Sequence, residues 1–235
     1  MIRLFVDQHL SKGMSVALTE KTAHYLIHVM RCPNNAEILC FNGKDGEWSA
    51  LLEIKNKKQL SLNLIKQTRA QTHPHPCVLC PALIKKDNMD LVLQKATELG
   101  VTDIYPLITE HTVHTHFNQT HAEAIVREAA EQCERLDVPT IHPTDKVSTI
   151  YQKLCKDYTC CCLSERICAD NRLSPEATVA FFVGPEGGWS KKEMDFFQKN
   201  DCVLCHFDVG ILRAETAGIG ILAAWQLGKT LYLKK

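Results

Sequence analysis

Hydrophobic and polar residues follow two different patterns along this chain, and the first covers residues 1–69. Two apolar runs, 37–41 and 48–54, flank a loop rich in Asn, Gly and Asp, which predicts a β-hairpin. Residues 60–64 alternate between apolar and polar, as expected of a half-buried strand. A short helix is predicted near residues 22–30. A small β-barrel with one or two helices fits this part of the chain.

The rest of the chain alternates between strand and helix patterns. Apolar runs predict strands at 77–83, 103–108, 158–163, 178–183 and 202–207. Helical spacing predicts helices over 88–99 and from Ala217 to a stop at Gly228, and Thr120 with Glu123 predicts a capping box for a third helix. Strands separated by helices imply a largely parallel sheet that is covered on both faces.

The segment between the two patterns, residues 72–76, contains two prolines in three residues and is predicted to be a linker. A length of 235 residues allows two modest domains. The formal net charge is zero, but residues 1–72 hold ten Lys and Arg against six Asp and Glu, and the remainder holds 17 against 21. A basic N-terminal part favours a nucleic-acid partner, although ordinary surfaces also carry such an excess.

No apolar run approaches the length of about 18 residues that a membrane helix needs, and the N-terminus lacks a signal-peptide pattern. A cytoplasmic location is therefore predicted, and with it reduced thiols for the twelve cysteines. The pairs Cys77/Cys80 and Cys202/Cys205 lie in strand-like runs, where residues three apart point to opposite faces and cannot share a metal ion. Most cysteines are therefore predicted to be small buried hydrophobes.

Four histidines lie close together in the sequence around a predicted loop: His111, His114, His116 and His121. They lack a nearby cysteine or carboxylate pattern typical of zinc sites. A solvated polar loop is the preferred interpretation, and no metal site is predicted.

A glycine-rich turn, residues 184–189, directly follows the apolar strand 178–183, and Ser190 with Glu193 predicts a capping box that opens the next helix. Open α/β sheets bind ligands at this kind of position, and glycines let the backbone approach a ligand closely. The spacing matches neither a P-loop nor a G-x-G-x-x-G motif, which excludes those nucleotide sites. A plain strand-to-helix turn stays open as the alternative.

Three polar residues, Arg213, Glu215 and Thr216, crowd between the strand 202–207 and the apolar helix that follows. Thr216 could be a helix N-cap, and Glu215 could favour the positive end of the helix. Arg213 is not explained by capping. A planar cation at the carboxyl end of a sheet suits a phosphate, a carboxylate or a developing anion.

The segments FFVGPEGGWSKKE and ILRAETA, in this order, resemble the signature of the SPOUT methyltransferases. More closely, the chain resembles the ribosomal RNA small subunit methyltransferase E family over essentially its whole length. The segments KKDNMDLVLQKATELGVTDIYPL, REAAEQC and RLFV…HYLIHVMR also carry this resemblance.

The resemblance implies an α/β protein with a PUA-like β-barrel over residues 1–70, which binds RNA, and a SPOUT methyltransferase domain over residues 73–235 with a C-terminal trefoil knot. It also implies a homodimer that uses S-adenosylmethionine to methylate N3 of one uridine in 16S rRNA of the small ribosomal subunit. A non-catalytic RNA-binding protein of the same fold, and a SPOUT enzyme acting on a different RNA, are the alternatives.

The resemblance also implies roles for individual residues. Arg213 would stabilise the uracil anion or hold an RNA phosphate, and Glu215 would act as the base or brace its loop. The cofactor would contact three loops, which contribute Leu163, Ser164 and Glu165, then Val183, Gly184, Pro185, Glu186 and Gly187, then Phe207, Val209, Gly210, Ile211, Leu212 and Thr216. Contacts to RNA would come from Arg3, Arg31, Lys85, Lys86 and Arg135.

The chain departs from the family pattern in two segments. Family members usually have Gly and Arg where Asp208 and Gly210 stand, and they tend to have Gly and Arg where Glu134 and Asp137 stand. These departures lower the basicity near the expected RNA-binding face and motivate the non-catalytic alternative.

Overall fold

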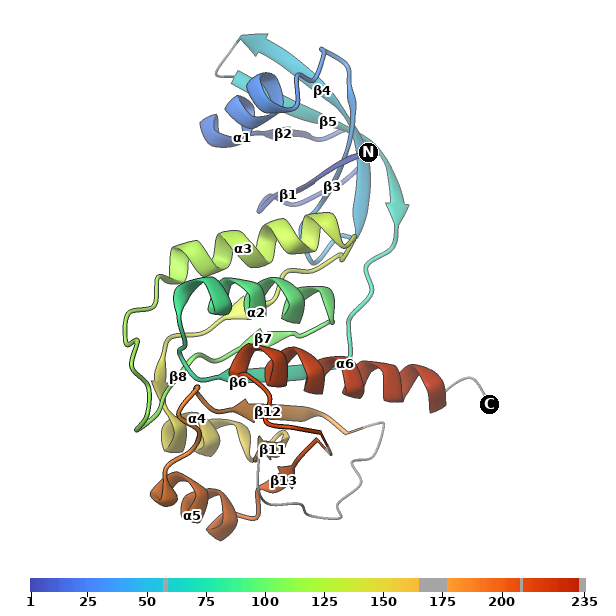
Figure 1. Cartoon of the computed structure of the whole chain (residues 1–235). Coiled ribbons are helices and arrows are strands. Elements are labelled where there is room, and N and C mark those ends of the chain that lie inside the picture. Colours follow the sequence, from blue (N-terminus) through green and yellow to red (C-terminus); the bar gives the residue numbers. More distant parts are fainter. Residues whose placement is uncertain (57–58, 165–176, 208, 233–235) are drawn as a thin grey trace. The chain divides into compact units, whose positions relative to one another are not determined.

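The computed structural model divides into two compact units (Figure 1). It describes residues 1–56, 59–164, 177–207 and 209–232. The first unit is not contiguous in sequence, because residues 130–138 join residues 1–73 in it. The second unit is built from residues 74–129 and the residues from 139 onward.

The first unit contains a five-stranded sheet with the strand order β1-β3-β4-β5-β2. Its strands are β1 (Ile2–Phe5), β2 (Ser15–Ala17), β3 (Glu37–Phe41), β4 (Glu47–Asn56) and β5 (Gln59–Arg69). The hairpin predicted from the sequence is confirmed as the antiparallel pair β3–β4. The helix predicted near residues 22–30 is observed as α1 (Glu20–His24), which continues into the π-helical turn η1 (Tyr25–Val29).

The second unit contains a six-stranded sheet in which all neighbours are parallel, in the order β13-β11-β12-β6-β7-β9. The strands are β6 (Cys77–Pro81), β7 (Asp103–Ile104), β9 (Thr140–Ile141), β11 (Thr159–Leu163), β12 (Val179–Val183) and β13 (Val203–Cys205). The prediction of a parallel sheet is therefore confirmed. Strand β12 lies in its interior, and all five of its residues are buried.

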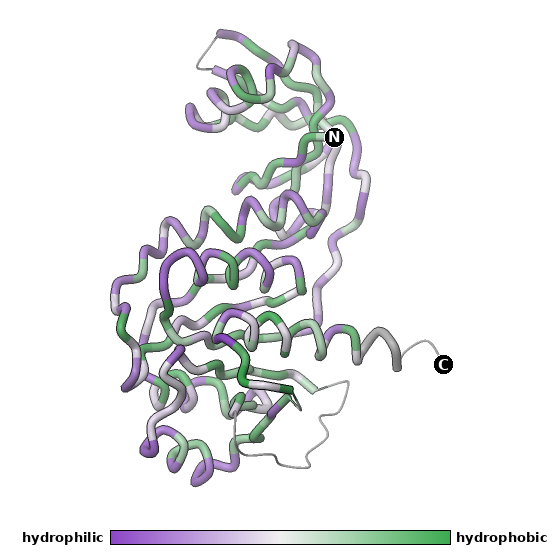
Figure 2. The backbone as a smooth tube through the Cα atoms, in the orientation of Figure 1, coloured by the Kyte–Doolittle hydropathy of each residue, from purple (hydrophilic) through white to green (hydrophobic). Residues whose placement is uncertain are grey.

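Helices cover both faces of this sheet. On one face, Phe182 of β12 belongs to an apolar cluster with residues of α4 (Val147–Leu154) and α5 (Lys191–Lys199). On the other face, Phe181 packs edge-on against Trp225 of α6 (Ala214–Tyr232), with 6.0 Å between ring centroids. Helix α6 in turn packs against α2 (Lys86–Glu98). Along α3 (Gln119–Gln132) hydrophobic and hydrophilic residues alternate within each turn (Figure 2).

Three local predictions are wrong. The strand predicted over 103–108 is divided at Pro106, which has no N–H, into β7 and β8 (Leu107–Ile108), and β8 pairs with β10 (Asp145–Lys146). The cap of α3 is Asn118 rather than Thr120, because the Asn118 Oδ1 accepts a hydrogen bond from the backbone N of His121 at 3.0 Å. Helix α6 begins at Ala214 and continues through Gly228.

The buried cysteines belong to the packed interior. Cys80, Cys160 and Cys162 lie in the apolar cluster under α4 and α5, and burial raises the pKa of the Cys160 thiol to about 12. Each therefore packs as a neutral, small side chain. No helix among the described residues has both the length and the apolar content needed to cross a bilayer.

Candidate functional site

The carboxyl ends of three neighbouring strands meet at one edge of the parallel sheet. Strand β11 pairs in parallel with both β12 and β13, so the loops after these strands start side by side. The backbone N of Ser164 donates a hydrogen bond to the Cys205 carbonyl at 2.8 Å, and the Trp189 indole N–H donates to the Leu163 carbonyl at 2.8 Å. The first predicted ligand loop is thus in contact with residues that directly flank the other two. In parallel sheets such an edge is the usual ligand site.

The glycine-rich turn after β12 is closed by its own backbone. The N–H of Gly188 donates to the Pro185 carbonyl at 2.9 Å, and Gly188 has a φ of +67°, which favours glycine. Gly184 is needed for packing, because a Cβ on it would lie 3.2 Å from the Trp189 ring. Val183 and Pro185 are buried, whereas Glu186 and Gly187 are exposed. The turn therefore offers its peptide groups rather than large side chains.

The predicted capping box at the start of α5 is confirmed. The Ser190 hydroxyl accepts from the Glu193 N–H at 3.2 Å, and the Glu193 carboxylate accepts from the Ser190 N–H at 2.9 Å. The other oxygen of Glu193 accepts from the Glu110 N–H at 3.0 Å. A hydrogen bond from Ser190 and the nearby Lys192 ammonium, at 3.5 Å, lower the pKa of the Glu110 carboxyl.

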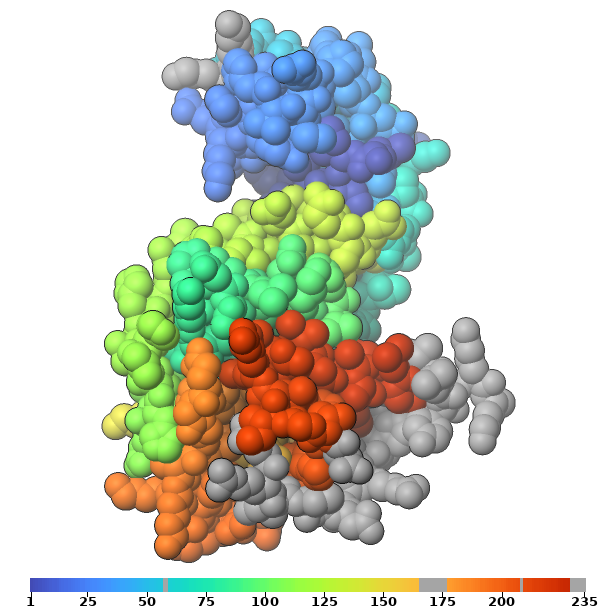
Figure 3. All heavy atoms as spheres, viewed as in Figure 1, coloured from blue at the N-terminus to red at the C-terminus, as the bar shows by residue number. Residues whose placement is uncertain are grey.

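His111 braces the glycine-rich turn, a role that no local sequence pattern predicts. Its Nδ1 lies 3.0 Å from the Gly187 carbonyl and 3.1 Å from the Gly188 carbonyl, so Nδ1 carries the hydrogen and donates it. A Cβ on Gly187 would lie 3.1 Å from the His111 Cβ. In Figure 3 the segment with His111, in light green, lies beside the orange segment that follows β12. Sequence spacing alone cannot reveal this contact between residues 76 positions apart.

The segment after β13 leaves large apolar side chains uncovered. Val209 is 64% exposed and Ile211 is 76% exposed, and Gly210 between them is exposed too. Leu212 is half-buried. Phe207 is half-buried and packs beside Gly220 of α6, where an added Cβ would lie 3.4 Å from its ring. Exposed apolar side chains at a predicted ligand edge are the kind of surface that ligands and partner proteins cover.

The two predicted catalytic residues differ in their surroundings. Arg213 is exposed at the start of α6, where it can meet a ligand. Glu215 is only 8% exposed, and its Oε2 atom is buried without a hydrogen-bond partner in the described part of the chain. Thr216 is exposed and is not the N-cap, because α6 already begins at Ala214. An unpaired buried carboxylate oxygen is costly and calls for a role.

The predicted cofactor residue Glu165 lies outside the described residues, and so does Asp208, one of the departures from the family pattern. The four clustered histidines are not joined into a metal site: among the residues that the structure describes, no three His, Cys, Asp or Glu side chains could hold a metal ion together.

Two of the residues predicted to contact RNA have guanidinium groups that are largely buried and bound within the first unit. Arg3 is 8% exposed, and its guanidinium is held by Glu47 at 2.7 Å and by backbone carbonyls, so it does not face solvent. Arg135 has an 11% exposed side chain that pairs with Asp137 at 2.7 Å. Both cations serve the packing of the first unit.

The other three predicted RNA contacts are exposed. Arg31 and Lys85 face solvent, and Lys85 immediately precedes α2. Lys86 is exposed too, with its ammonium 2.6 Å from the Asp90 carboxylate.

Comparison with known proteins places nearly the whole chain in one group of RNA methyltransferases. The family described as "RNA methyltransferase domain" matches residues 71–226, and the family described as "RNA methyltransferase PUA domain" matches residues 18–65. The chain is 31% identical to the ribosomal RNA small subunit methyltransferase E of Rickettsia conorii, over 96% of this chain and 95% of that protein.

Two solved structures are similar along their full length. One is a ribosomal RNA small subunit methyltransferase E from Neisseria gonorrhoeae bound to S-adenosyl methionine, with 28% identity, a TM-score of 0.87 and 97% of each chain covered. The other is a methyltransferase from Legionella pneumophila in complex with the bound cofactor SAM, with 26% identity, a TM-score of 0.88 and 97% of each chain covered.

Proposed function

Because this chain belongs to the ribosomal RNA small subunit methyltransferase E family, we propose that it transfers a methyl group from S-adenosylmethionine to N3 of one uridine in 16S rRNA. The observation that carries this proposal is the edge where the loops after β11, β12 and β13 meet, in a chain that matches such methyltransferases end to end. The similar proteins were solved with the cofactor bound.

The residues at this edge fit the cofactor. Exposed peptide groups at 186–187 and 209–211 suit the polar parts of a nucleoside and an amino acid, and a Cβ on Gly210 would meet open space. We assign the cofactor contacts to the three loops already predicted: Leu163, Ser164 and Glu165; Val183, Gly184, Pro185, Glu186 and Gly187; Phe207, Val209, Gly210, Ile211, Leu212 and Thr216. When bound, S-adenosylmethionine supplies an electrophilic methyl group.

The uridine N3 carries a proton and becomes a good nucleophile only when this proton leaves. We assign Glu215 as the acceptor of that proton, because its Oε2 has no other partner in the described residues. The exposed Arg213 guanidinium then stabilises the negative charge on the uracil ring. Bracing of the α6 N-terminus by the Glu215 carboxylate is the alternative role.

A second copy of the chain would cover part of the exposed apolar surface. Val209 and Ile211 support a homodimer that forms next to the cofactor edge. Light scattering on the purified protein tests the dimer directly.

The two parts of the chain would have different roles. The first 70 residues would bind RNA, and residues 73–235 would form the catalytic domain with its knotted C-terminal part. The protein would work in the cytoplasm on the small ribosomal subunit.

Methylation of small ribosomal subunits tests the proposed function. Subunits from a strain that lacks the gene are incubated with the protein and labelled cofactor, and the rRNA is mapped by mass. We expect one 3-methyluridine in 16S rRNA. Total RNA from the same strain is treated in parallel, and a product there but not in 16S rRNA would support the SPOUT enzyme of different specificity.

Matched variants separate catalysis from binding. Arg213→Ala should lower kcat by about 10²-fold or more, whereas Lys199→Ala, which removes an exposed charge at the end of α5, should not. Wild-type protein that binds rRNA but neither binds cofactor nor transfers methyl would support the non-catalytic alternative.

A further inference from the structure

A cavity of about 560 Å³ lies in the second unit, between the start of α2, the loop before α3 and the first turn of α3. Its floor is apolar and includes the buried residues Leu83, Met89, Leu93 and Ala122. Its volume lies within the roughly 300–1,000 Å³ that small-ligand sites have. No part of it is formed by the residues assigned to the cofactor.

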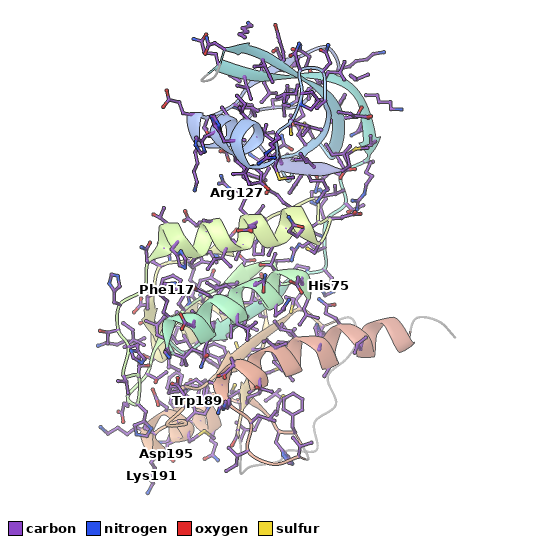
Figure 4. The ribbon with its side chains drawn as sticks, turned by 45° about the horizontal axis from the view of Figure 1, so that its top comes forward. His75, Phe117, Arg127, Trp189, Lys191 and Asp195 are labelled. Atoms are coloured by element: carbon purple, nitrogen blue, oxygen red, sulfur yellow. The ribbon has the colours of Figure 1, made fainter. Side chains whose placement is uncertain are left out.

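The rim of the cavity carries flat rings and polar groups. Phe117 is half-buried on the loop that leads into α3, and Figure 4 shows it there, beside α2. The polar lining residues include Lys86, Asp90, His114, His116, Asn118 and His121. Phenyl and imidazole rings stack on nucleobases, and a lysine ammonium binds phosphate.

Among the described residues, Asp90 is the one acidic side chain that lines this cavity. Burial disfavours its charge, but hydrogen bonds from Lys86 at 2.6 Å and His121 at 2.9 Å outweigh this and lower the pKa of Asp90. The carboxylate is therefore ionised at neutral pH and holds both cavity-lining side chains in place. It can also accept hydrogen bonds from the amino and imino groups of a base.

The cavity lies next to the cofactor edge. The N–H of Ala82 donates to the carbonyl of Val183, the last residue of β12, at 2.8 Å, and the next residue, Leu83, lines the cavity. The loop that forms the other wall is anchored on the glycine-rich turn through His111. One loop therefore connects the cofactor turn to the cavity rim.

From this geometry we infer that the cavity between α2 and α3 binds an unpaired nucleotide of the substrate RNA, with its base stacked on Phe117 and its phosphate near Lys86. This inference rests on the proposed function, because the ligand is a part of the RNA that the enzyme methylates. RNA is recognised mainly through splayed-out bases that stack on aromatic side chains. The mixture of rings, one lysine and one carboxylate over an apolar floor suits a base better than it suits a bare phosphate.

The kinetic test uses purified small ribosomal subunits as substrate at saturating S-adenosylmethionine. Phe117→Leu keeps the apolar volume and removes the ring face, so KM for the subunits should rise by about tenfold or more, while cofactor affinity stays unchanged. Phe117→Tyr keeps the ring and should stay within about twofold of the wild type. His116→Ala changes an exposed side chain, does not threaten folding, and should also raise KM. Lys86→Ala should raise KM as well, and Lys199→Ala, which removes an exposed charge outside the cavity, is its charge-matched control.

Ultraviolet cross-linking of the same complex gives an independent readout. Mass spectrometry should find a nucleotide attached to the peptide that contains residues 113–122. A wild-type KM for Phe117→Leu and His116→Ala, with cross-links only elsewhere, would overturn the inference while methylation by the wild type leaves the proposed function intact. If the wild type transfers no methyl group, the proposed function fails, and the cross-link alone decides whether this cavity holds a nucleotide.

Discussion

The guanidinium of Arg3 lies 2.7 Å from the carboxylate of Glu47, and both side chains are about 95% buried. Arg3 also donates hydrogen bonds to the backbone carbonyls of Ala130, Glu131 and Arg135, at 2.8–3.1 Å. One buried cation thus ties strand β1 to strand β4 and to residues 130–135. This explains why these residues, distant in sequence, belong to the first unit.

Removing this cation should destabilise the protein strongly. Arg3→Met takes away the closest cation from the buried Glu47 carboxylate and leaves it with the Thr68 hydroxyl at 2.9 Å and the half-exposed Arg69 guanidinium at 3.7 Å. This should cost about 3 kcal/mol in free energy of unfolding, the lower end of the range for breaking a buried ion pair. Urea denaturation followed by circular dichroism measures the loss. Lys66→Met, at an exposed position on β5, should change stability by less than about 0.5 kcal/mol.

The double variant Arg3→Met/Glu47→Leu should recover part of the loss, because no unpaired charge is then buried. An Arg3→Met protein as stable as the Lys66→Met control would show that the ion pair does not have this role.

Glu134 should be a strained position that glycine relieves. It has a φ of +61°, in the left-handed region, and its carbonyl accepts a hydrogen bond from Arg69 at 2.9 Å. Glu134→Gly should raise the free energy of unfolding by about 1 kcal/mol. Glu134→Ala keeps the Cβ and should bring no such gain, so equal melting temperatures for the two variants would contradict this account.

Much of the fold could be predicted because its signals are local. The apolar run 178–183 and the Ser190–Glu193 pair each carry enough information within a few residues to predict β12 and the start of α5. The resemblance also singled out Glu134 as a place where family members tend to have glycine, and there the backbone takes a conformation that favours glycine. Periodicity and turn chemistry suffice for such elements.

Other features could not be predicted because they depend on contacts between distant residues. Arg3 was predicted to bind RNA, since no local pattern reveals that Glu47 and three carbonyls enclose it. The strand order that places β11 between β12 and β13 is also not encoded in any one segment. His111 meets the glycine-rich turn only because the chain folds back on it.

Asp45 should make the first unit sensitive to acid. Its carboxylate accepts hydrogen bonds from the Leu10 N–H at 2.8 Å, from Asn42 and from His9. The bond from the Leu10 backbone, with those of Asn42 and His9, lowers the pKa of Asp45 despite partial burial. A carboxyl group whose pKa is lower in the folded state stabilises the folded protein at pH values above its unfolded pKa of about 4. This contribution is lost as the pH falls through the pKa of the folded state.

Asp45→Asn should therefore lower the free energy of unfolding at pH 7 by about 1–3 kcal/mol, and the difference from the wild type should shrink below about pH 4. Urea titrations between pH 3 and 7 measure this. The exposed Asp7→Asn variant is the control and should show no such trend. A constant difference at every pH would exclude the Asp45 carboxylate as its source.

Gly187 should be required for cofactor binding through His111. A Cβ at this position would lie 3.1 Å from the His111 Cβ, so the turn must move away from the imidazole that holds its carbonyls. Gly187→Ala should weaken S-adenosylmethionine binding by about 1 kcal/mol or more, as calorimetry can measure. Gly228→Ala in α6, where a Cβ meets nothing within 4 Å, is the control and should leave the affinity unchanged.

Glu215 should act in the chemical step rather than in cofactor binding. Its Oε2 is buried without a partner among the described residues, so Glu215→Gln keeps the shape and removes the acceptor for the N3 proton. We expect kcat to fall by about 10²–10⁴-fold, with little change in cofactor affinity. The melting temperature should hold or rise, because a buried neutral amide costs less than an unpaired carboxylate. If Glu215→Gln keeps its turnover but loses stability, the carboxylate braces the N-terminus of α6, and the proton acceptor must be sought elsewhere at this edge.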